Sequence, residues 1–249
     1  MKRLIRTVSW SSGVAVMLAL VAPSVAAQTN PGPWSVSFDA GVQMALSGDA
    51  HTGGSGRVLN LPTSVSAKSY GDVFGQGFYW AAGLGYAVGE RGEFRVQGAY
   101  TANPAEQLQV GTVADLPLLA QFDDYKAFAM DVGYRQYLSA RDRRMRPFVG
   151  GGAGFTRVDR IRSTFTVPAA SVTLPNVDFY GASTVPSFNA NGGVQFGLSS
   201  RIFFQALADF RWHGDLDGQD GLAGTGLEGL NDEGRRWTMP VTGGITVRF

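Results

Sequence analysis

The sequence predicts an all-β fold, namely an eight-stranded antiparallel up-and-down transmembrane β-barrel. Three features indicate it: an amino-terminal export signal, eight segments in which apolar and polar residues alternate, and connections that are alternately short and long. Alternation with a period of two gives a β-strand one apolar and one polar face. A closed barrel with its apolar faces outward suits a lipid environment.

Residues 1–27 are expected to be a Sec-type signal peptide that is cleaved on export. Basic residues occupy positions 2, 3 and 6, an apolar run follows at 13–22, and small residues before Gln28 form a cleavage site. The alternative is an uncleaved membrane helix, but this run is short for about 30 Å of hydrocarbon. Residues 28–249 are then the barrel domain, with 28–33 as a short lead.

The composition of the chain after cleavage excludes several classes of function. Subtracting the three basic residues of the signal leaves 18 Lys and Arg (21 − 3) against 20 Asp and Glu. A near-neutral exported chain gives no electrostatic reason to bind nucleic acid. The absence of cysteine excludes disulfides and thiolate metal sites.

The first four predicted strands cover residues 34–46, 77–88, 93–102 and 122–138. Each alternates over at least the roughly 9–11 residues that a tilted membrane strand needs. Their apolar faces consist of Trp34, Val36, Phe38, Val42, Met44 and Leu46, then Phe78, Trp80, Leu84, Tyr86 and Val88, then Phe94, Val96 and Tyr100, and finally Phe128, Met130, Val132 and Tyr134.

The last four predicted strands cover residues 146–157, 187–198, 201–212 and 236–249. The first of these contains the run FVGGGAGF, and its faces stay unassigned because glycine has no side chain to mark them. The last alternates over its whole length. Its odd positions, such as Trp237, Val241 and Phe249, are apolar, whereas Arg236 and Arg248 represent its polar even positions.

The connections between these strands alternate in length. Residues 89–92, 139–145 and 199–200 form short turns, whereas 47–76, 103–121, 158–186 and 213–235 are long. Short periplasmic turns and long external loops are typical of outer-membrane barrels. The even strand number then predicts that both termini are periplasmic.

The polar faces are expected to line the lumen, because a charge facing lipid costs about 2–4 kcal/mol at the bilayer midplane. An eight-stranded barrel is just wide enough for side chains to fill. We therefore expect the charges to pair and plug the lumen, and the alternative is a narrow pore lined by them. The predicted lumen network is Asp39, Glu93, Arg95, Asp131, Arg135, Arg201, Asp209, Arg211 and Arg248. The predicted interfacial aromatic girdle is Trp34, Trp80, Tyr86, Phe94, Tyr100, Trp212 and Trp237.

Two motifs, RPFVGGGAGF at 146–155 and GITVRF at 244–249, accompany this architecture. With it, the chain resembles the OmpA-like, opacity-type "porin family" outer-membrane barrels. The resemblance implies the outer membrane of a Gram-negative bacterium, contact with its lipid and lipopolysaccharide, and insertion by the barrel-assembly machinery with periplasmic chaperones. Ile245, Val247 and Phe249 are the expected assembly signal. No carboxy-terminal peptidoglycan-binding domain is expected.

For activity, we expect a structural, envelope-integrity or adhesion-type role carried by the long loops, with a surface ligand that the sequence does not identify. One alternative is a narrow pore for small solutes or small hydrophobic compounds. A lipid A-modifying enzyme is least favoured, because neither His51 nor His213 has a suitably spaced serine and acid. We therefore expect no catalytic residue and no cofactor.

The acidic last loop is a weak metal candidate through Asp215, Asp217 and Asp220. The run departs from the EF-hand pattern, since Asp220 stands where glycine is required and Gly226 where glutamate is required. A solvated loop without a metal is therefore the favoured interpretation.

The second and third long loops are unusually apolar, as in VADLPLL at 113–119 and FTVPAASVTL at 165–174. One interpretation is that the strands continue as hairpins beyond the membrane and bury these residues against each other. The other is an exposed recognition surface. The hairpins are favoured.

Overall fold

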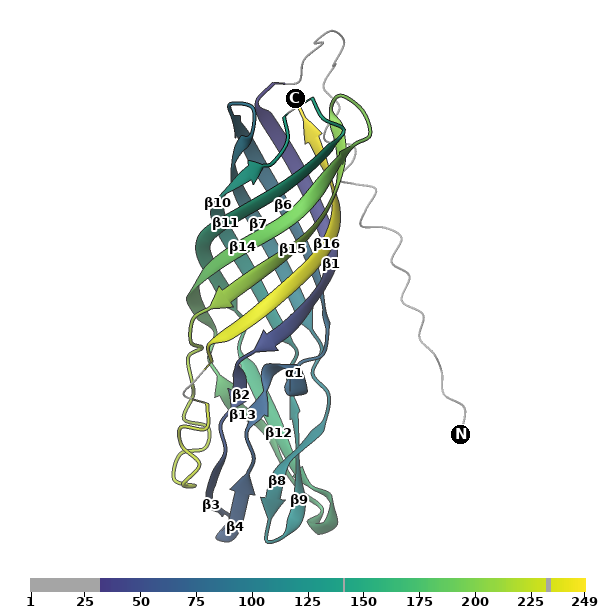
Figure 1. Ribbon diagram of the computed structural model, residues 1–249. Coiled ribbons are helices and arrows are strands. Elements are labelled where there is room, and N and C mark those ends of the chain that lie inside the picture. Colours follow the sequence, from purple (N-terminus) through teal and green to yellow (C-terminus); the bar gives the residue numbers. More distant parts are fainter. Residues whose placement is uncertain (1–31, 141, 232–233) are drawn as a thin grey trace, which may run out of the picture. The chain divides into compact units, whose positions relative to one another are not determined.

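The computed structural model describes residues 32–140, 142–231 and 234–249. The predicted signal peptide and the start of the lead segment lie outside these residues. Eight long strands close into one antiparallel barrel in the order β1-β16-β15-β14-β11-β10-β7-β6, which confirms the predicted fold class (Figure 1). Their bounds are β1 (Trp34–Ser47), β6 (Gly77–Val88), β7 (Gly92–Asn103), β10 (Tyr125–Tyr137), β11 (Met145–Val158), β14 (Ser183–Gly197), β15 (Ile202–His213) and β16 (Arg236–Arg248).

The barrel closes where the first strand pairs with the last. The β1–β16 register runs from Ser35 opposite Arg248 to Ala45 opposite Thr238, with one irregularity before Ser47. Closure bonds every strand on both sides, which removes the unpaired edges that a bilayer does not tolerate. We call the end of the barrel near Trp34 and Phe249 the terminal end, and the opposite end the loop end.

The exterior of the barrel is apolar and the interior polar. On β7, Phe94 is 54% exposed on the outside, whereas its neighbour Glu93 is 3% exposed in the lumen. The same alternation holds on β16, where Ile245 is exposed and Thr246 is buried. A closed sheet with an apolar outer face is the arrangement of transmembrane barrels.

The structure assigns the faces of β11, which the sequence left open. Arg146, Phe148 and Thr156 are buried in the lumen, whereas Val149 and Phe155 are exposed outside. Glycines occupy the three lumen positions between Phe148 and Thr156. A Cβ added to the middle one would lie 2.7 Å from the backbone oxygen of the neighbouring strand β10. The glycines therefore allow close strand packing.

The bounds of the barrel strands agree with the prediction to within one residue, except at the starts of the fourth and sixth strands. The sixth barrel strand begins at Ser183, before the predicted start at residue 187. The fourth barrel strand begins at Tyr125, because Phe122 belongs to a separate strand beyond the barrel. Arg201 precedes β15 and is only partly buried.

The long loops form a second β-structure at the loop end, which we call the loop extension (residues 49–74, 104–124, 159–182 and 214–231). Its strands are β2 (Asp49–His51), β3 (Gly54–Val58), β4 (Leu61–Val65), β5 (Lys68–Ser69), β8 (Leu108–Val113), β9 (Leu116–Phe122), β12 (Ile161–Val167) and β13 (Val172–Tyr180). Six of them form one sheet in the order β13-β12-β9-β8-β4-β3, and β2 pairs with β5. The favoured hairpins of the second and third loops are thereby confirmed. The burial expected with them is partial, because Val113, Leu118 and Val167 are buried whereas Leu116, Val172 and Leu174 are exposed.

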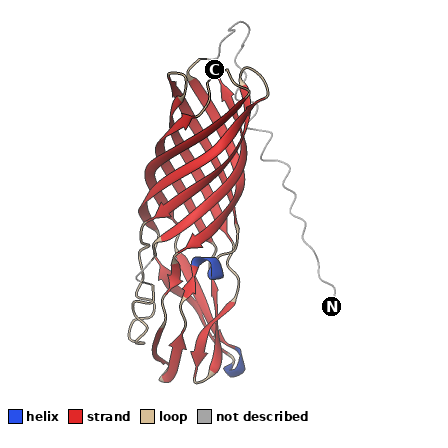
Figure 2. Ribbon diagram, viewed as in Figure 1, coloured by secondary structure: helices blue, strands red, loops and turns tan. Residues whose placement is uncertain are grey.

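Helical structure is limited to two single turns within the described ranges, α1 (Tyr70–Val73) and η2 (Pro168–Ala170), both in the loop extension (Figure 2). In those ranges, no helix is long and apolar enough to span a membrane.

The fourth long loop connects the two edges of the six-stranded sheet. On one side, the backbone N–H of Arg57 in β3 donates to the Thr225 oxygen at 2.6 Å. On the other, the N–H of Gln219 donates to the Phe179 oxygen in β13 at 3.1 Å. Leu222, Leu227 and Leu230 of this loop are buried in the core of the extension. The four loops thus share one apolar interior.

Candidate functional site

The strongest charge cluster of the lumen is centred on Arg211. Its guanidinium lies 2.7 Å from a carboxylate oxygen of Asp131 and 2.6 Å from one of Asp209, and all three side chains are at most 5% exposed. Arg95 lies 3.9 Å from Asp39 and 3.8 Å from Glu93. These contacts bring six of the nine predicted network residues together in two clusters of three.

Arg135 differs from the expected pairing with a carboxylate. In the described part of the chain, no Asp or Glu oxygen lies within salt-bridge distance of it. Its Nη1 donates to Gln205 at 3.1 Å, and its guanidinium lies 3.8 Å from the ring centre of Phe148. Arg248 donates to Gln195 at 3.2 Å, and its guanidinium lies 4.2 Å from the ring centre of Phe203. An aromatic face therefore stabilises Arg135 where the sequence suggested a carboxylate.

The predicted network omitted two fully buried arginines, Arg146 and Arg236. Arg146 stacks over Tyr137 at 3.7 Å, and Arg236 donates to the Tyr125 hydroxyl at 2.6 Å. Arg236 was recognisable as a polar even position of the last strand. Arg146 was not, because the glycines that follow it hid the alternation.

The aromatic residues of the predicted girdle lie on the outer face in edge, tilted or stacked pairs. Near the terminal end, Trp34 contacts Tyr86 at 4.9 Å between ring centres, and Phe94 contacts Tyr134 at 5.3 Å. Nearer the loop end, the pairs are Trp80–Tyr100 at 6.2 Å, Phe188–Trp212 at 5.6 Å and Phe210–Trp237 at 4.5 Å.

The residues expected to form the assembly signal lie at the terminal end of β16. Ile245 and Phe249 are exposed on the outer face, and the Phe249 N–H donates to the Trp34 oxygen at 3.0 Å. Their role in insertion stays a prediction.

The acidic candidates of the last loop do not converge. Asp215 pairs with Arg235 at 3.2 Å, and Asp217 accepts from Gln219. Across the residues that the structure describes, no three His, Cys, Asp or Glu side chains are placed to hold a metal ion. His213 lies in the lumen with its ring nitrogens 3.1 Å from the hydroxyls of Thr156 and Thr238.

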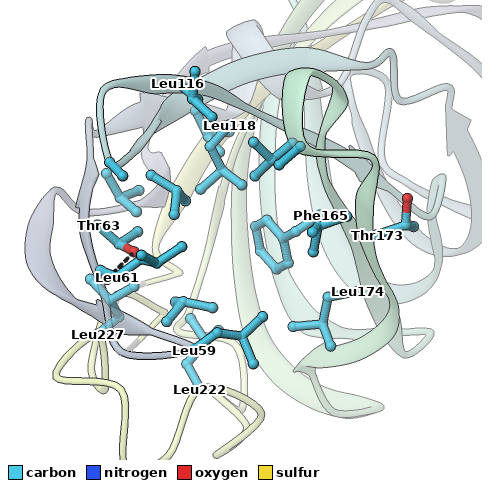
Figure 3. Close-up of a pocket in the computed structure, with 18 of the residues that line it drawn as sticks. Leu59, Leu61, Thr63, Leu116, Leu118, Phe165, Thr173, Leu174, Leu222 and Leu227 are labelled. Carbon is cyan, nitrogen blue, oxygen red and sulfur yellow. Dashed lines mark hydrogen bonds between the residues drawn. The ribbon is translucent and has the colours of Figure 1, made fainter.

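The loop extension encloses an apolar pocket of about 200 Å³ between its hairpins and the fourth loop. In Figure 3 the side chains of Leu61, Leu118 and Phe165 point toward a common space, with Leu174 and Leu227 on its sides. The lining residues are His51, Val58, Leu59, Leu61, Thr63, Val65, Val110, Val113, Ala114, Leu116, Leu118, Phe122, Phe165, Val167, Ala170, Val172, Thr173, Leu174, Phe179, Leu222, Leu227 and Leu230.

The pocket has an exposed rim and a buried floor. Leu59 is 75% exposed at a hairpin end, and Leu116 and Leu174 are also exposed. Phe122 and Phe179 are almost completely buried. The lining therefore leads from solvent at the hairpin ends to the aromatic core of the extension.

Two hairpin turns hold apolar residues at this rim in an unfavourable backbone conformation. Leu59 and Asn60 have φ angles of 51° and 65°, and Ala114 and Asp115 have 47° and 65°. Both central residues of a type I′ hairpin turn need positive φ, which suits Asn and Asp but costs Leu and Ala about 1 kcal/mol or more each. Such strain is concentrated at functional sites.

Among the described residues of the lining, three have polar side chains, namely His51, Thr63 and Thr173. The Thr63 hydroxyl donates to the Leu61 oxygen at 3.2 Å. The Thr173 hydroxyl points away from the pocket in Figure 3. His51, at the floor, is 2% exposed.

The His51 ring packs against two phenylalanines of the floor. Its centre lies 6.1 Å from that of Phe122 and 6.1 Å from that of Phe179. Nδ1 lies 3.0 Å from the Thr52 backbone oxygen, whereas Nε2 is buried and has no hydrogen-bond partner among the described residues. Burial lowers the pKa of His51, and nearby Lys68 lowers it further, against the opposing effects of the Thr52 contact and Asp49.

The lowered pKa of His51 predicts that the loop extension loses stability on acidification. Between the folded pKa and the unfolded value near 6.5, the unfolded state binds more protons, so stability rises with pH in this window. Stability is therefore expected to fall as the pH drops below about 6.5. Limited proteolysis of the extension between pH 7.5 and 5 measures this, with His51→Phe as control. The same pH dependence in that variant would assign it to another group.

The comparisons with known proteins concern the fold. No family model and no curated protein sequence matches the chain. Among solved structures, it is similar to Neisserial surface protein A (12% identity, TM-score 0.46, 87% of this chain and 97% of that chain) and to OprG from Pseudomonas aeruginosa (10%, 0.43, 88% and 98%). A third is Ail, the attachment invasion locus protein of Yersinia pestis (13%, 0.41, 88% and 99%). These are small eight-stranded outer-membrane barrels. At these identities and TM-scores, the likeness carries no information on ligand or activity.

Proposed function

We propose that the protein is an outer-membrane β-barrel whose loop extension binds a small hydrophobic molecule on the outer side of the membrane. The apolar pocket is the observation that carries this proposal. Both termini are then periplasmic. The long loops would then carry out the expected surface interaction, with a small hydrophobic molecule as the ligand.

The barrel exterior supports the membrane location. Large apolar side chains such as Val132 and Ile245 cover the outside of the closed sheet, where water would disfavour them. Outer-membrane lipid and lipopolysaccharide are the proposed surroundings, and the barrel-assembly machinery with its chaperones is the proposed route of insertion.

The size and lining of the pocket support a small hydrophobic ligand. Ligand pockets are mostly apolar and carry few polar groups that orient the ligand. An apolar cavity of about 150 Å³ in another protein stays dry and binds benzene. At about 200 Å³, this pocket suits a molecule somewhat larger than benzene.

Packing beneath the pocket favours binding over conduction. Phe74 contacts Phe122 of the pocket floor at 6.4 Å and Tyr125 at 5.8 Å between ring centres. The Tyr125 hydroxyl accepts from Arg236, which is fully buried in the lumen. The charged clusters around Arg211 and Arg95 occupy the lumen as well. We therefore propose a filled lumen without a catalytic centre.

Filling the pocket is expected to weaken binding strongly. Leu118 is 7% exposed on the wall, so Leu118→Trp places an indole in the cavity. Calorimetric titration of the refolded protein in amphipol with heptyl methyl ether should show saturable binding, weakened at least about tenfold in this variant. Leu198→Trp is the matched control, because Leu198 is 66% exposed near the terminal end. Its binding should equal that of the unmodified protein.

Two results would contradict the proposal. One is the absence of saturable binding of any apolar probe of this size. The other is equal binding by a folded Leu118→Trp variant, which would place the ligand elsewhere. Folding of the barrel in each variant is checked by gel electrophoresis in detergent. A folded barrel gives a band that shifts when the sample is boiled, and this heat-dependent gel shift should be retained.

A further inference from the structure

We propose that the ligand of this pocket is an uncharged amphiphile, an alcohol or a phenol, whose hydroxyl donates a hydrogen bond to Nε2 of His51. This inference rests on the proposed function of the pocket and names the class of molecule that it takes.

The hydrogen-bond direction follows from the neutral form of the imidazole. Nδ1 lies 3.0 Å from the Thr52 oxygen, which can only accept, so Nδ1 carries the ring proton. Nε2 then carries a lone pair and acts as an acceptor. The partner it lacks must be a donor.

Within the described lining, His51 is the one buried polar side chain with a hydrogen-bonding atom that lacks a partner. Thr63 already donates to Leu61, and Thr173 is directed away from the pocket. The donor group of the ligand is therefore expected at the buried end, with the apolar body toward the rim.

Energetics favour a donor at this position. A buried acceptor without a partner costs about 1–3 kcal/mol, and a donor that reaches it recovers part of this energy. Nε2 is covered by its neighbours, so the ring must tilt toward the pocket as the hydroxyl approaches. The ring contacts Phe122 and Phe179 at ordinary aromatic distances, with 6.1 Å between centres in both pairs.

The lining also excludes charged head groups. Among the described residues, those that line the pocket include no Lys, Arg, Asp or Glu. A carboxylate or ammonium group at the floor would be buried without a counter-ion, which is strongly unfavourable. A hydroxyl needs only the single acceptor that His51 provides.

A pair of isomeric probes tests the inference. 1-Octanol and heptyl methyl ether have the same atoms and similar volume, but only the alcohol has a donor. Titration of both into the full refolded chain in amphipol should show about three- to tenfold tighter binding of the alcohol, the range expected for one buried hydrogen bond. The same titrations with the Leu118→Trp variant, whose pocket is filled, measure the non-specific partition of each probe into protein and amphipol.

His51→Phe removes the acceptor and keeps a ring at the floor. In this variant the ratio of the alcohol affinity to the ether affinity should fall to about one. His51→Leu provides a second variant should the phenylalanine disturb the extension, whose integrity is checked by limited proteolysis.

The outcomes separate the two proposals. Equal affinity of the unmodified protein for both probes, or an alcohol preference that persists in a folded His51 variant, overturns the role of His51 and leaves the hydrophobic pocket intact. Failure of both probes to bind overturns the proposed function itself.

Discussion

Arg211→Met is expected to lower the free energy of unfolding of the barrel by about 3–5 kcal/mol, since it removes one partner of a buried ion cluster. Asp131 and Asp209 would both lose their guanidinium partner, at 2.7 and 2.6 Å, within a lumen where they are at most 5% exposed. Asp131 would keep only the Ser187 hydroxyl at 3.3 Å among the contacts that the structure shows. The urea midpoint of the refolded protein in lipid vesicles measures the effect.

A matched control uses an exposed ion pair of the same chain. Arg160 lies 3.9 Å from Asp178, and both side chains are more than half exposed. Solvent screens such a pair, so Arg160→Met is expected to change stability by less than about 1 kcal/mol. Equal midpoints for the two variants would contradict a lumen stabilised by paired charges.

Phe179→Ala is expected to destabilise the loop extension by about 3–5 kcal/mol, the range for removing a large buried aromatic side chain. Phe179 is 2% exposed and contacts the rings of Phe122 and Tyr180, each at 5.2 Å between centres. These contacts join β13 to β9, so the loss reaches across the sheet. Protease sensitivity should rise in the extension, while the heat-dependent gel shift of the barrel is retained.

Leu59→Ala is the control for this substitution. Leu59 is 75% exposed at a hairpin end. Its truncation should therefore change the free energy of unfolding of the extension, measured by protease resistance, by less than about 0.5 kcal/mol. Loss of the barrel gel shift in Phe179→Ala would show that barrel and extension unfold together, contrary to the expectation of separate stabilities.

The buried site and the proposed recognition have one physical cause. Four loops that are far apart in the chain pack their apolar sides together above the barrel, and the space they leave is lined by leucine, valine and phenylalanine. A single imidazole at the floor adds one acceptor. In the proposed recognition, the apolar walls fit the body of the ligand and one hydrogen bond orients it.

The strand number, the strand faces and the placement of the long loops could be read from the sequence, because alternation is a local property of the chain. Trp237 outside and Thr238 inside are fixed by a period of two, whatever the rest of the chain does. The same rule failed at Arg146, where three consecutive glycines and a fourth after Ala153 erase the pattern.

The partners of the lumen charges were decided only by the tertiary structure. Alternation places Arg135 and Arg211 inside alike, but which group each one meets depends on the register and twist of strands on opposite sides of the barrel. Arg211 meets two carboxylates, whereas Arg135 meets Phe148 and Gln205.

The pocket was likewise beyond local reasoning. The sequence indicated apolar hairpins at 113–119 and 165–174, and these hairpins form. That their inner faces meet Leu227 of the last loop and the ring of His51 from the first depends on contacts between residues up to about 180 positions apart, as in the Thr52–Leu230 hydrogen bond (|i−j| = 178). Periodicity in a sequence reports the faces of an element, whereas a binding site is made where the faces of separate elements meet.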